Sequence, residues 1–184
     1  MNPIEALVLT LQDLVGNVPE LVQPLIALLA GAVPFIEGEG GAIIGVVGGI
    51  NPVVAAIAAA AGNFLSVLLV VMLTSSARTA VVHAHAARVA AAGGGGTATL
   101  TEAPPAKPVS KGRERFQKFL VRFGVPGATI LGPLAIPTQF IASILVAGGT
   151  SRAWVLLWQA VAIAIWTTVG TVSIWIAIGL IAGF

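Results

Sequence analysis

The chain has 184 residues, of which 57% are hydrophobic and only 9% are charged. Because soluble domains carry about 25% charged residues, this composition predicts an integral membrane protein rather than a soluble domain. Cysteine is absent, which excludes a disulfide framework and thiol chemistry.

The charges are separated along the chain by sign. Eight of the nine basic residues lie between Arg78 and Arg122, whereas every charge before Arg78 is acidic. Lys and Arg are retained on the cytoplasmic side of membrane segments, so residues 77–123 are predicted to be cytoplasmic, in a bacterial inner membrane. The basic residues therefore indicate which side of the membrane this segment occupies, and nucleic acid is not an expected partner. The first 30 residues carry no Lys or Arg and lack the positive flank of a signal peptide.

The first half of the chain predicts three membrane-associated segments. Residues 2–16 place Pro3 at the first helical position, and their apolar side chains follow helical spacing, which predicts an amphipathic helix on the membrane surface. Residues 19–49 are apolar but interrupted by proline and glycine. Residues 51–76 are nearly uncharged and long enough to span the bilayer.

The second half follows after a polar hinge. Residues 77–110 are predicted to extend the first span into the cytoplasm and then to form a flexible linker, because "GGGGTATLTEAPPAKPVS" has no apolar set to bury. Residues 111–123 place Phe and Leu on one helical face and Lys and Arg on the other, which predicts a basic amphipathic helix. Residues 125–149 are apolar and interrupted by prolines, and residues 151–182 predict a second long transmembrane helix.

The two halves align with an offset of 100 residues, which places the Gly-Gly-Ile-Asn run at 48–51 on the Gly-Gly-Thr-Ser run at 148–151. If the first half starts outside and ends in the cytoplasmic hinge, its broken segment must enter and leave on the outer side. The second half then starts inside, and its broken segment enters from the cytoplasm. The sequence therefore predicts an all-α membrane protein of two inverted repeats, 1–76 and 111–184, each with an interfacial helix, a re-entrant helical hairpin and a transmembrane helix. The alternative, in which each broken segment is a full span, fits the basic residues less well.

Two acidic residues, Glu37 and Glu39, lie near the turn of the first predicted hairpin. A half-helix of ~10 residues rises ~15 Å, about the depth of the bilayer midplane, so these carboxylates are expected at the bottom of a cavity open to the outside. Burial of a carboxylate is costly unless it is paired or protonated, and two of them in one cavity can share a proton. We predict a proton or cation site here. The alternative for Glu37 is a carboxylate that only caps a half-helix.

Other polar residues in the apolar segments are candidate substrate contacts. Gln139 follows Pro137 in the second hairpin and could hydrogen-bond the substrate or the first hairpin. Asn63 and Gln159 lie in the two spans, where a hydrogen bond between helices is the commoner role. Arg152 is expected either to anchor a helix end or to face an anionic headgroup. The residues expected to shape the hairpin backbones are Pro34, Gly40, Gly41, Pro133 and Pro137.

The sequence contains no nucleophile–base pair, phosphate-binding loop or metal-ligand cluster, so neither an enzyme nor a cofactor is predicted. His83 and His85 are two residues apart on a predicted helix and face apart, which does not indicate a metal site.

The runs "VPFIEGEGGAI" and "GPLAIPTQFIASILVAGG", the latter followed by a long span, resemble the small multidrug export family and, through it, the DedA/VTT group of membrane proteins. The similarity covers roughly residues 20–75 and 112–180. Family members often carry an arginine soon after the first glutamate, where this chain has Glu39. The resemblance implies paired re-entrant loops and a transport function.

Three functions follow as alternatives. The first is a proton-linked secondary transporter of a small or amphipathic substrate. The second, implied by the DedA-like resemblance, is a flippase or scramblase for an anionic lipid carrier such as undecaprenyl phosphate. The third is a structural or assembly membrane protein. The expected partners are membrane lipids, the substrate, protons and a second copy of the chain, because so short a chain can bury its hairpins by dimerising.

Overall fold

The structure, a computed structural model, describes residues 3–91 and 123–182. All regular elements in these two ranges are helical, which confirms the prediction of an all-α chain. The predicted linker and all but the last residue of the predicted amphipathic helix 111–123 lie outside the described residues.

The helices are few and differ greatly in length. Those of the first range are α1 (Pro3–Asn17), α2 (Gln23–Ala32), α3 (Glu37–Val47) and α4 (Pro52–Ala91). Those of the second are a helical segment 123–131, the 3-10 helix η1 (Gly132–Leu134), α6 (Thr138–Ala147) and α7 (Arg152–Ala182). Only α4, with 40 residues, and α7, with 31, are long and apolar enough among the described helices to cross a membrane.

The two short helices α3 and α6 end in the same turn. The second residue of each Gly-Gly pair, Gly49 or Gly149, is left-handed, with φ of 95° or 99°. In both turns the next amide donates to the carbonyl five residues before it, at 2.9 and 3.1 Å, which is the Schellman pattern. A β-carbon would be strained in this conformation. The Gly-Gly pairs seen 100 residues apart in the sequence therefore form equivalent turns, each leading into a long helix.

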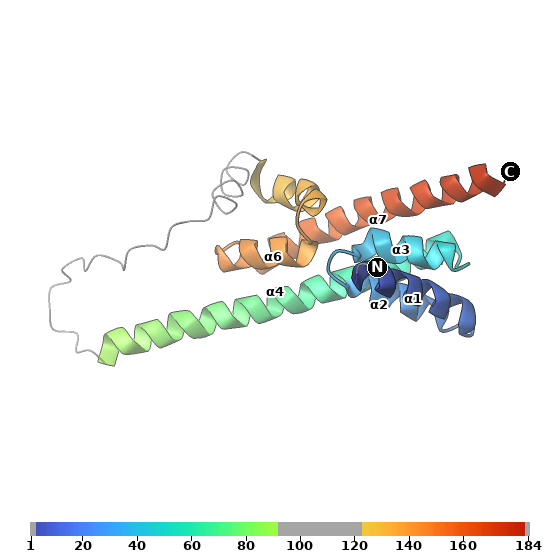
Figure 1. Cartoon of the computed structure of the whole chain (residues 1–184). Helices are drawn as coiled ribbons and strands as arrows, with labels where there is room; N and C mark the ends of the chain where they lie inside the picture. The colour runs from blue at the N-terminus through green and yellow to red at the C-terminus, as the bar shows by residue number, and fades with distance from the viewer. Residues whose placement is uncertain (1–2, 92–122, 183–184) are drawn as a thin grey trace.

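Helices α3 and α6 extend in opposite directions from the middle of the molecule (Figure 1). Near the end of α3, a β-carbon on Gly45 would lie 2.9 Å from Cβ of Ala55 in α4. Beyond the end of α6, a β-carbon on Gly149 would lie 3.1 Å from the guanidinium of Arg78 in α4. Ala55 and Arg78 are ~35 Å apart along the helix at 1.5 Å per residue, so the two short helices reach opposite ends of the apolar part of α4.

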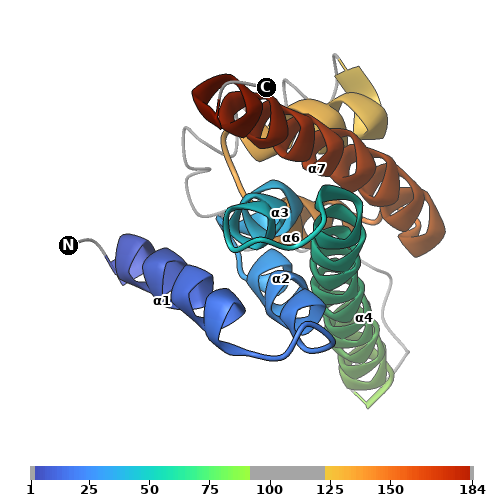
Figure 2. The same cartoon turned by 90° about the vertical axis from the view of Figure 1, so that its right-hand side faces the viewer.

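Helix α4 is the centre of the packing and contacts α2, α3, α6 and α7. Helix α1 packs against α2 and α3 and lies to one side of α4 and α7 (Figure 2). Small residues allow the closest approaches: a β-carbon on Gly31 of α2 would overlap the carbonyl of Ala59, and one on Gly62 of α4 would overlap the carbonyl of Leu28. Backbone therefore packs directly on backbone where α2 crosses α4.

The two long helices expose most of their apolar side chains. Only 28% of the most apolar stretch of α4 and 22% of that of α7 are buried. Ile57 and Leu69 on α4 and Trp175 on α7 are between 60% and 66% exposed. Soluble monomers rarely expose contiguous apolar surface on this scale. Both helices are long and apolar enough to cross a membrane, by length and composition.

Replacing Gly62 with Ala should lower the free energy of unfolding by about 1–3 kcal/mol, because the added methyl group overlaps backbone that cannot rotate away. Alanine favours helix over glycine by ~1 kcal/mol, so the overlap must outweigh this gain. The matched control is Gly16→Ala in α1, where the new β-carbon has nothing within 4 Å. Thermal unfolding of the detergent-purified variants measures both, and equal midpoints for the two variants would contradict the close crossing.

Candidate functional site

The first residues of α3 and α6 meet in the interior of the protein. Glu37 begins α3 and is 4% exposed, and Thr138 begins α6 and is 2% exposed. Oε1 of Glu37 accepts two hydrogen bonds from Thr138, one from its backbone N–H at 2.5 Å and one from its hydroxyl at 2.6 Å. Because the first N–H groups of a helix have no partner within it, the carboxylate caps a helix that starts 101 positions later in the chain.

A strained turn between α2 and α3 places Glu37 at this position. Phe35 and Glu37 have φ of 72° and 56° and are the only non-glycine residues with positive φ in the described ranges. Each such residue costs of order 1 kcal/mol or more. The turn follows Pro34, and its Phe35 ring lies 6.4 Å from the ring of Phe140 in α6. The tips of both predicted hairpins are therefore in contact.

Polar side chains from α4, α6 and α7 surround the Glu37–Thr138 contact. The Thr138 hydroxyl is also 3.0 Å from Oδ1 of Asn63. Nε2 of Gln139 donates to Oγ of Ser66 at 2.9 Å, and Nε2 of Gln159 donates to the carbonyl of Thr138 at 3.2 Å. We call these six residues the central polar cluster: Glu37, Asn63, Ser66, Thr138, Gln139 and Gln159.

Two buried polar atoms beside these contacts have no hydrogen-bond partner among the described residues. They are Oε1 of Gln159 and Oγ1 of Thr167. Thr167 lies against the first turn of α3, where a β-carbon on Gly38 would overlap its hydroxyl. A buried polar atom without a partner costs ~1–3 kcal/mol. Each is a place where water or another polar group would gain a hydrogen bond.

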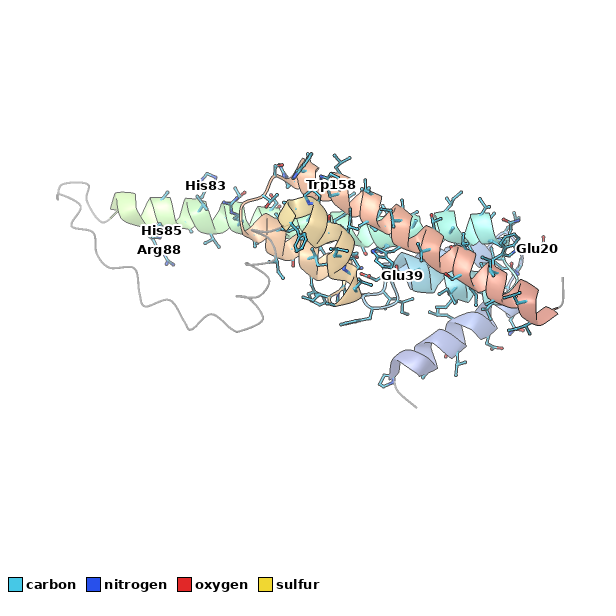
Figure 3. The ribbon with its side chains drawn as sticks, turned by 90° about the horizontal axis from the view of Figure 1, so that it is seen from above. Glu20, Glu39, His83, His85, Arg88 and Trp158 are labelled. Carbon is cyan, nitrogen blue, oxygen red and sulfur yellow. The ribbon has the colours of Figure 1, made fainter. Side chains whose placement is uncertain are left out.

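A cavity of about 170 Å³ adjoins the contact and is lined by Phe35, Glu37, Glu39 and residues 133–137. One water occupies ~30 Å³ of liquid, so the cavity has room for several waters or a small group. Within the described residues, Glu37 uses only Oε1 for hydrogen bonds, which leaves Oε2 available. Glu39 is half-buried and lies near the middle of the length of the molecule (Figure 3), with its Cβ against Gly170 of α7.

The structure brings together three of the five predicted binding residues, since Glu37, Asn63 and Gln139 all belong to the central polar cluster. Glu39 lines the adjoining cavity and makes no hydrogen bond to the cluster among the described residues. Arg152 is elsewhere: it begins α7 at the end of the molecule where α6 finishes.

The predicted hairpin-shaping residues lie in or beside the turns. Pro34 lies in the turn between α2 and α3, Pro133 lies in η1, and Pro137 directly precedes α6. A β-carbon on Gly41 would lie 2.7 Å from the backbone nitrogen of Gly31, so this glycine lets α3 approach α2. Gly40 lies against the Ile36 side chain, with its ideal β-carbon position 2.9 Å from Cγ2.

Sequence reasoning did not single out Thr138 or Ser66. The available signal was position: Thr138 directly follows a proline at a helix start, where N–H groups lack partners, and Ser66 is three residues after Asn63 on the same helical face. Among the described residues, no group of three or more His, Asp or Glu side chains is placed to hold a metal ion. His83 and His85 lie on the exposed far part of α4 (Figure 3).

No family model, curated protein or solved structure matches this chain. The resemblance to the small multidrug export family therefore remains a prediction from the sequence, and the site has to be interpreted from its own geometry.

Replacing Thr138 with Val removes the hydroxyl group but keeps the shape, and leaves oxygens of Glu37 and Asn63 without that donor. The free energy of unfolding should fall by about 1.5–3 kcal/mol, the contribution of one hydrogen bond to a charged group, because Oε1 of Glu37 then keeps only the backbone N–H of Thr138. Thr138→Ser keeps the hydroxyl and should lose much less. The thermal midpoints of both variants in detergent measure the difference, and a Ser variant as unstable as the Val variant would show that the hydroxyl is not the stabilising group.

Proposed function

We propose that the chain is a membrane transporter built from two inverted repeats, in which Glu37 binds and releases a proton while a small or amphipathic substrate moves. Two apolar helices with mostly exposed side chains support placement in a bilayer, because lipid would cover the surface that water would otherwise meet. The equivalent Gly-Gly turns and the oppositely directed short helices support the inverted repeats.

The position of the central polar cluster along α4 supports a site at mid-membrane depth. At 1.5 Å per residue, Asn63 is ~17 Å from Pro52 and ~23 Å from Arg78. A hydrocarbon core is ~30 Å thick, so a core centred on this stretch of α4 would have Asn63 near its midplane. Polar groups and helix ends are tolerated at that depth only where protein encloses them or a water-filled cavity meets them. Glu37 is buried by protein and borders a cavity with room for water, which supports this placement.

Charge supports an orientation for this arrangement. Glu20 lies at one end of the molecule and Arg88 near the other (Figure 3), with Arg78 and Arg152 towards the Arg88 end. By the tendency of basic residues to remain in the cytoplasm, the arginine end faces inward. The hairpin of α2 and α3 then enters from outside and that ending in α6 enters from the cytoplasm, in a bacterial inner membrane.

The Thr138 hydroxyl links the protonation state of Glu37 to the hydrogen bonds of Asn63. This hydroxyl has one proton but three oxygen acceptors within reach, in Glu37 at 2.6 Å, in Asn63 at 3.0 Å and in Gln139 at 3.4 Å, and the first two are the closest. When Glu37 is ionised, the hydroxyl donates to the carboxylate. When Glu37 is protonated, its O–H can donate to the hydroxyl oxygen, and the hydroxyl is free to donate to Asn63. A proton on α3 would thus change a hydrogen bond on α4.

The single observation that carries the proposal is the placement of Glu37. Its carboxylate is held between the starts of two oppositely directed short helices, with one oxygen bonded and the other available beside a cavity. A carboxylate needed only as a cap would satisfy this geometry too, and the transport measurement below separates the two roles.

A lipid flippase of the DedA-like kind is the second candidate, and a lateral groove favours it. The groove has a volume of about 520 Å³ and lies between the start of α4 and the second half of α7. Exposed side chains of Val53, Ile57, Val172 and Trp175 line it, so it is open to the surface that lipid would cover. A lipid carrier such as undecaprenyl phosphate could place its chain there while its headgroup crosses.

Transport in liposomes tests both candidates. Purified protein is reconstituted under an imposed proton gradient, and the accumulation of a fluorescent cationic amphiphile and the leaflet exchange of a fluorescent phosphate-bearing lipid are measured. Glu37→Gln should reduce the gradient-driven rate at least tenfold, because the amide cannot take up or release a proton. Glu20→Gln, at the end of the molecule, is the matched control and should transport like the unmodified chain.

A Glu37→Gln variant as active as the control would remove the proton-binding role. If the unmodified chain moves neither probe under any gradient, the structural or assembly alternative gains support.

A further inference from the structure

A second polar pocket lies where α6 ends and α7 begins, far along α4 from the central polar cluster. It has a volume of about 160 Å³. Its lining includes two arginines and four residues with hydroxyl groups: Arg78, Arg152, Ser75, Thr79, Thr150 and Ser151. This volume is about that of five waters, at ~30 Å³ each, and is enough for one tetrahedral oxyanion.

The Gly-Gly turn places one of the two guanidinium groups. Gly149 has φ of 99°, and an ideal β-carbon there would be 3.1 Å from Nη2 of Arg78 and 3.7 Å from its Cζ. The missing side chain therefore provides the space in which the Arg78 guanidinium lies across the turn. Arg152 follows three residues later, so the turn brings a guanidinium from α4 and one from α7 to the same pocket.

The pocket carries positive charge without a compensating carboxylate. Among the described residues, no Asp or Glu lines it, and neither Arg78 nor Arg152 has an ion pair or a hydrogen bond with another residue in these ranges. Two like charges at one site repel each other unless an anion lies between them. Guanidinium groups bind phosphate oxygens in bidentate fashion, and nearby hydroxyls add donors.

The equivalent turn at the other end of the molecule lacks this chemistry. A pocket of about 340 Å³ adjoins Gly49 and Asn51, and its charged residue is Glu20, with no arginine in its lining. The backbone turns match, but one pocket is acidic and the other is doubly basic. Of these two turn pockets, the one lined by Arg78 and Arg152 is therefore the one expected to bind an anion.

We propose that the pocket between Arg78 and Arg152 binds a phosphate group. Which molecule bears this phosphate rests on the proposed membrane placement. At the cytoplasmic end of α4, the nearest phosphate groups are the headgroups of lipids in the inner leaflet. Free phosphate has the same oxygens and is the alternative source. The bound phosphate holds the turn against α4 and fixes the start of α7 without taking part in the Glu37 site.

Lipid binding to the full chain tests this proposal. The protein in detergent micelles is titrated with phosphatidylglycerol or with phosphatidylcholine, and native mass spectrometry gives the lipid-bound fraction. Phosphatidylglycerol should bind more tightly, because the ammonium group of phosphatidylcholine offsets its phosphate. Arg78→Gln and Arg152→Gln should each weaken phosphatidylglycerol binding about tenfold, the loss expected for one charge-assisted hydrogen bond.

Arg88→Gln is the matched control, since Arg88 lies on the same helix outside the pocket, and it should change binding less than twofold. Displacement of the lipid by inorganic phosphate would identify free phosphate as a ligand, and resistance would assign the site to lipid; both support a phosphate site. Equal binding by the Arg78, Arg152 and Arg88 variants would overturn it. Glu37→Gln should bind lipid normally, so failure of the phosphate site and failure of the transport role are distinguishable.

Discussion

The hydrogen bonds between Glu37 and Thr138 connect the two halves of the chain at their centres. A carboxylate would be costly in an apolar interior, and the start of α6 would leave N–H groups without partners; each group satisfies the other. The positive φ of Glu37, the contact between Phe35 and Phe140 and the convergence of Asn63 on Thr138 all depend on this meeting. If it were absent, both short helices would begin in the interior with unsatisfied polar groups.

The two halves share a backbone plan but differ in chemistry. Equivalent glycine turns and short helices recur 100 residues apart, whereas the acid at the centre comes only from the first half. The outer turns differ in the same way, with Glu20 near one and Arg78 near the other. A symmetrical frame with asymmetric side chains can distinguish the two sides of a membrane. In the proposed function, this asymmetry orients the chain in the membrane, and the imposed gradients set the direction of transport.

The sequence predicted the features that depend on long apolar stretches or on residues that interrupt helices. Apolar length indicated α4 and α7, and prolines with paired glycines indicated the breaks around α3 and α6. The central contact was only partly predictable. Glu37, Asn63 and Gln139 were candidates because they are polar within apolar segments, but nothing local shows that a residue at 138 lies beside one at 37. The pairing of Arg152 with Arg78 also arises from tertiary packing, since 74 positions separate them.

The most direct test of the central claim is a cross-link between the hairpin tips in membrane vesicles. The chain has no cysteine, so Phe35→Cys and Phe140→Cys create a unique pair at side chains that are 67% and 49% exposed. A protease site inserted at residues 93–96 allows the halves to be separated unless a short thiol cross-linker joins them. The account predicts one joined band after proteolysis for this pair, and two fragments for a control pair of Phe35→Cys with Leu180→Cys at the far end of α7. Two fragments from the Phe35–Phe140 pair would contradict the meeting of the two short helices.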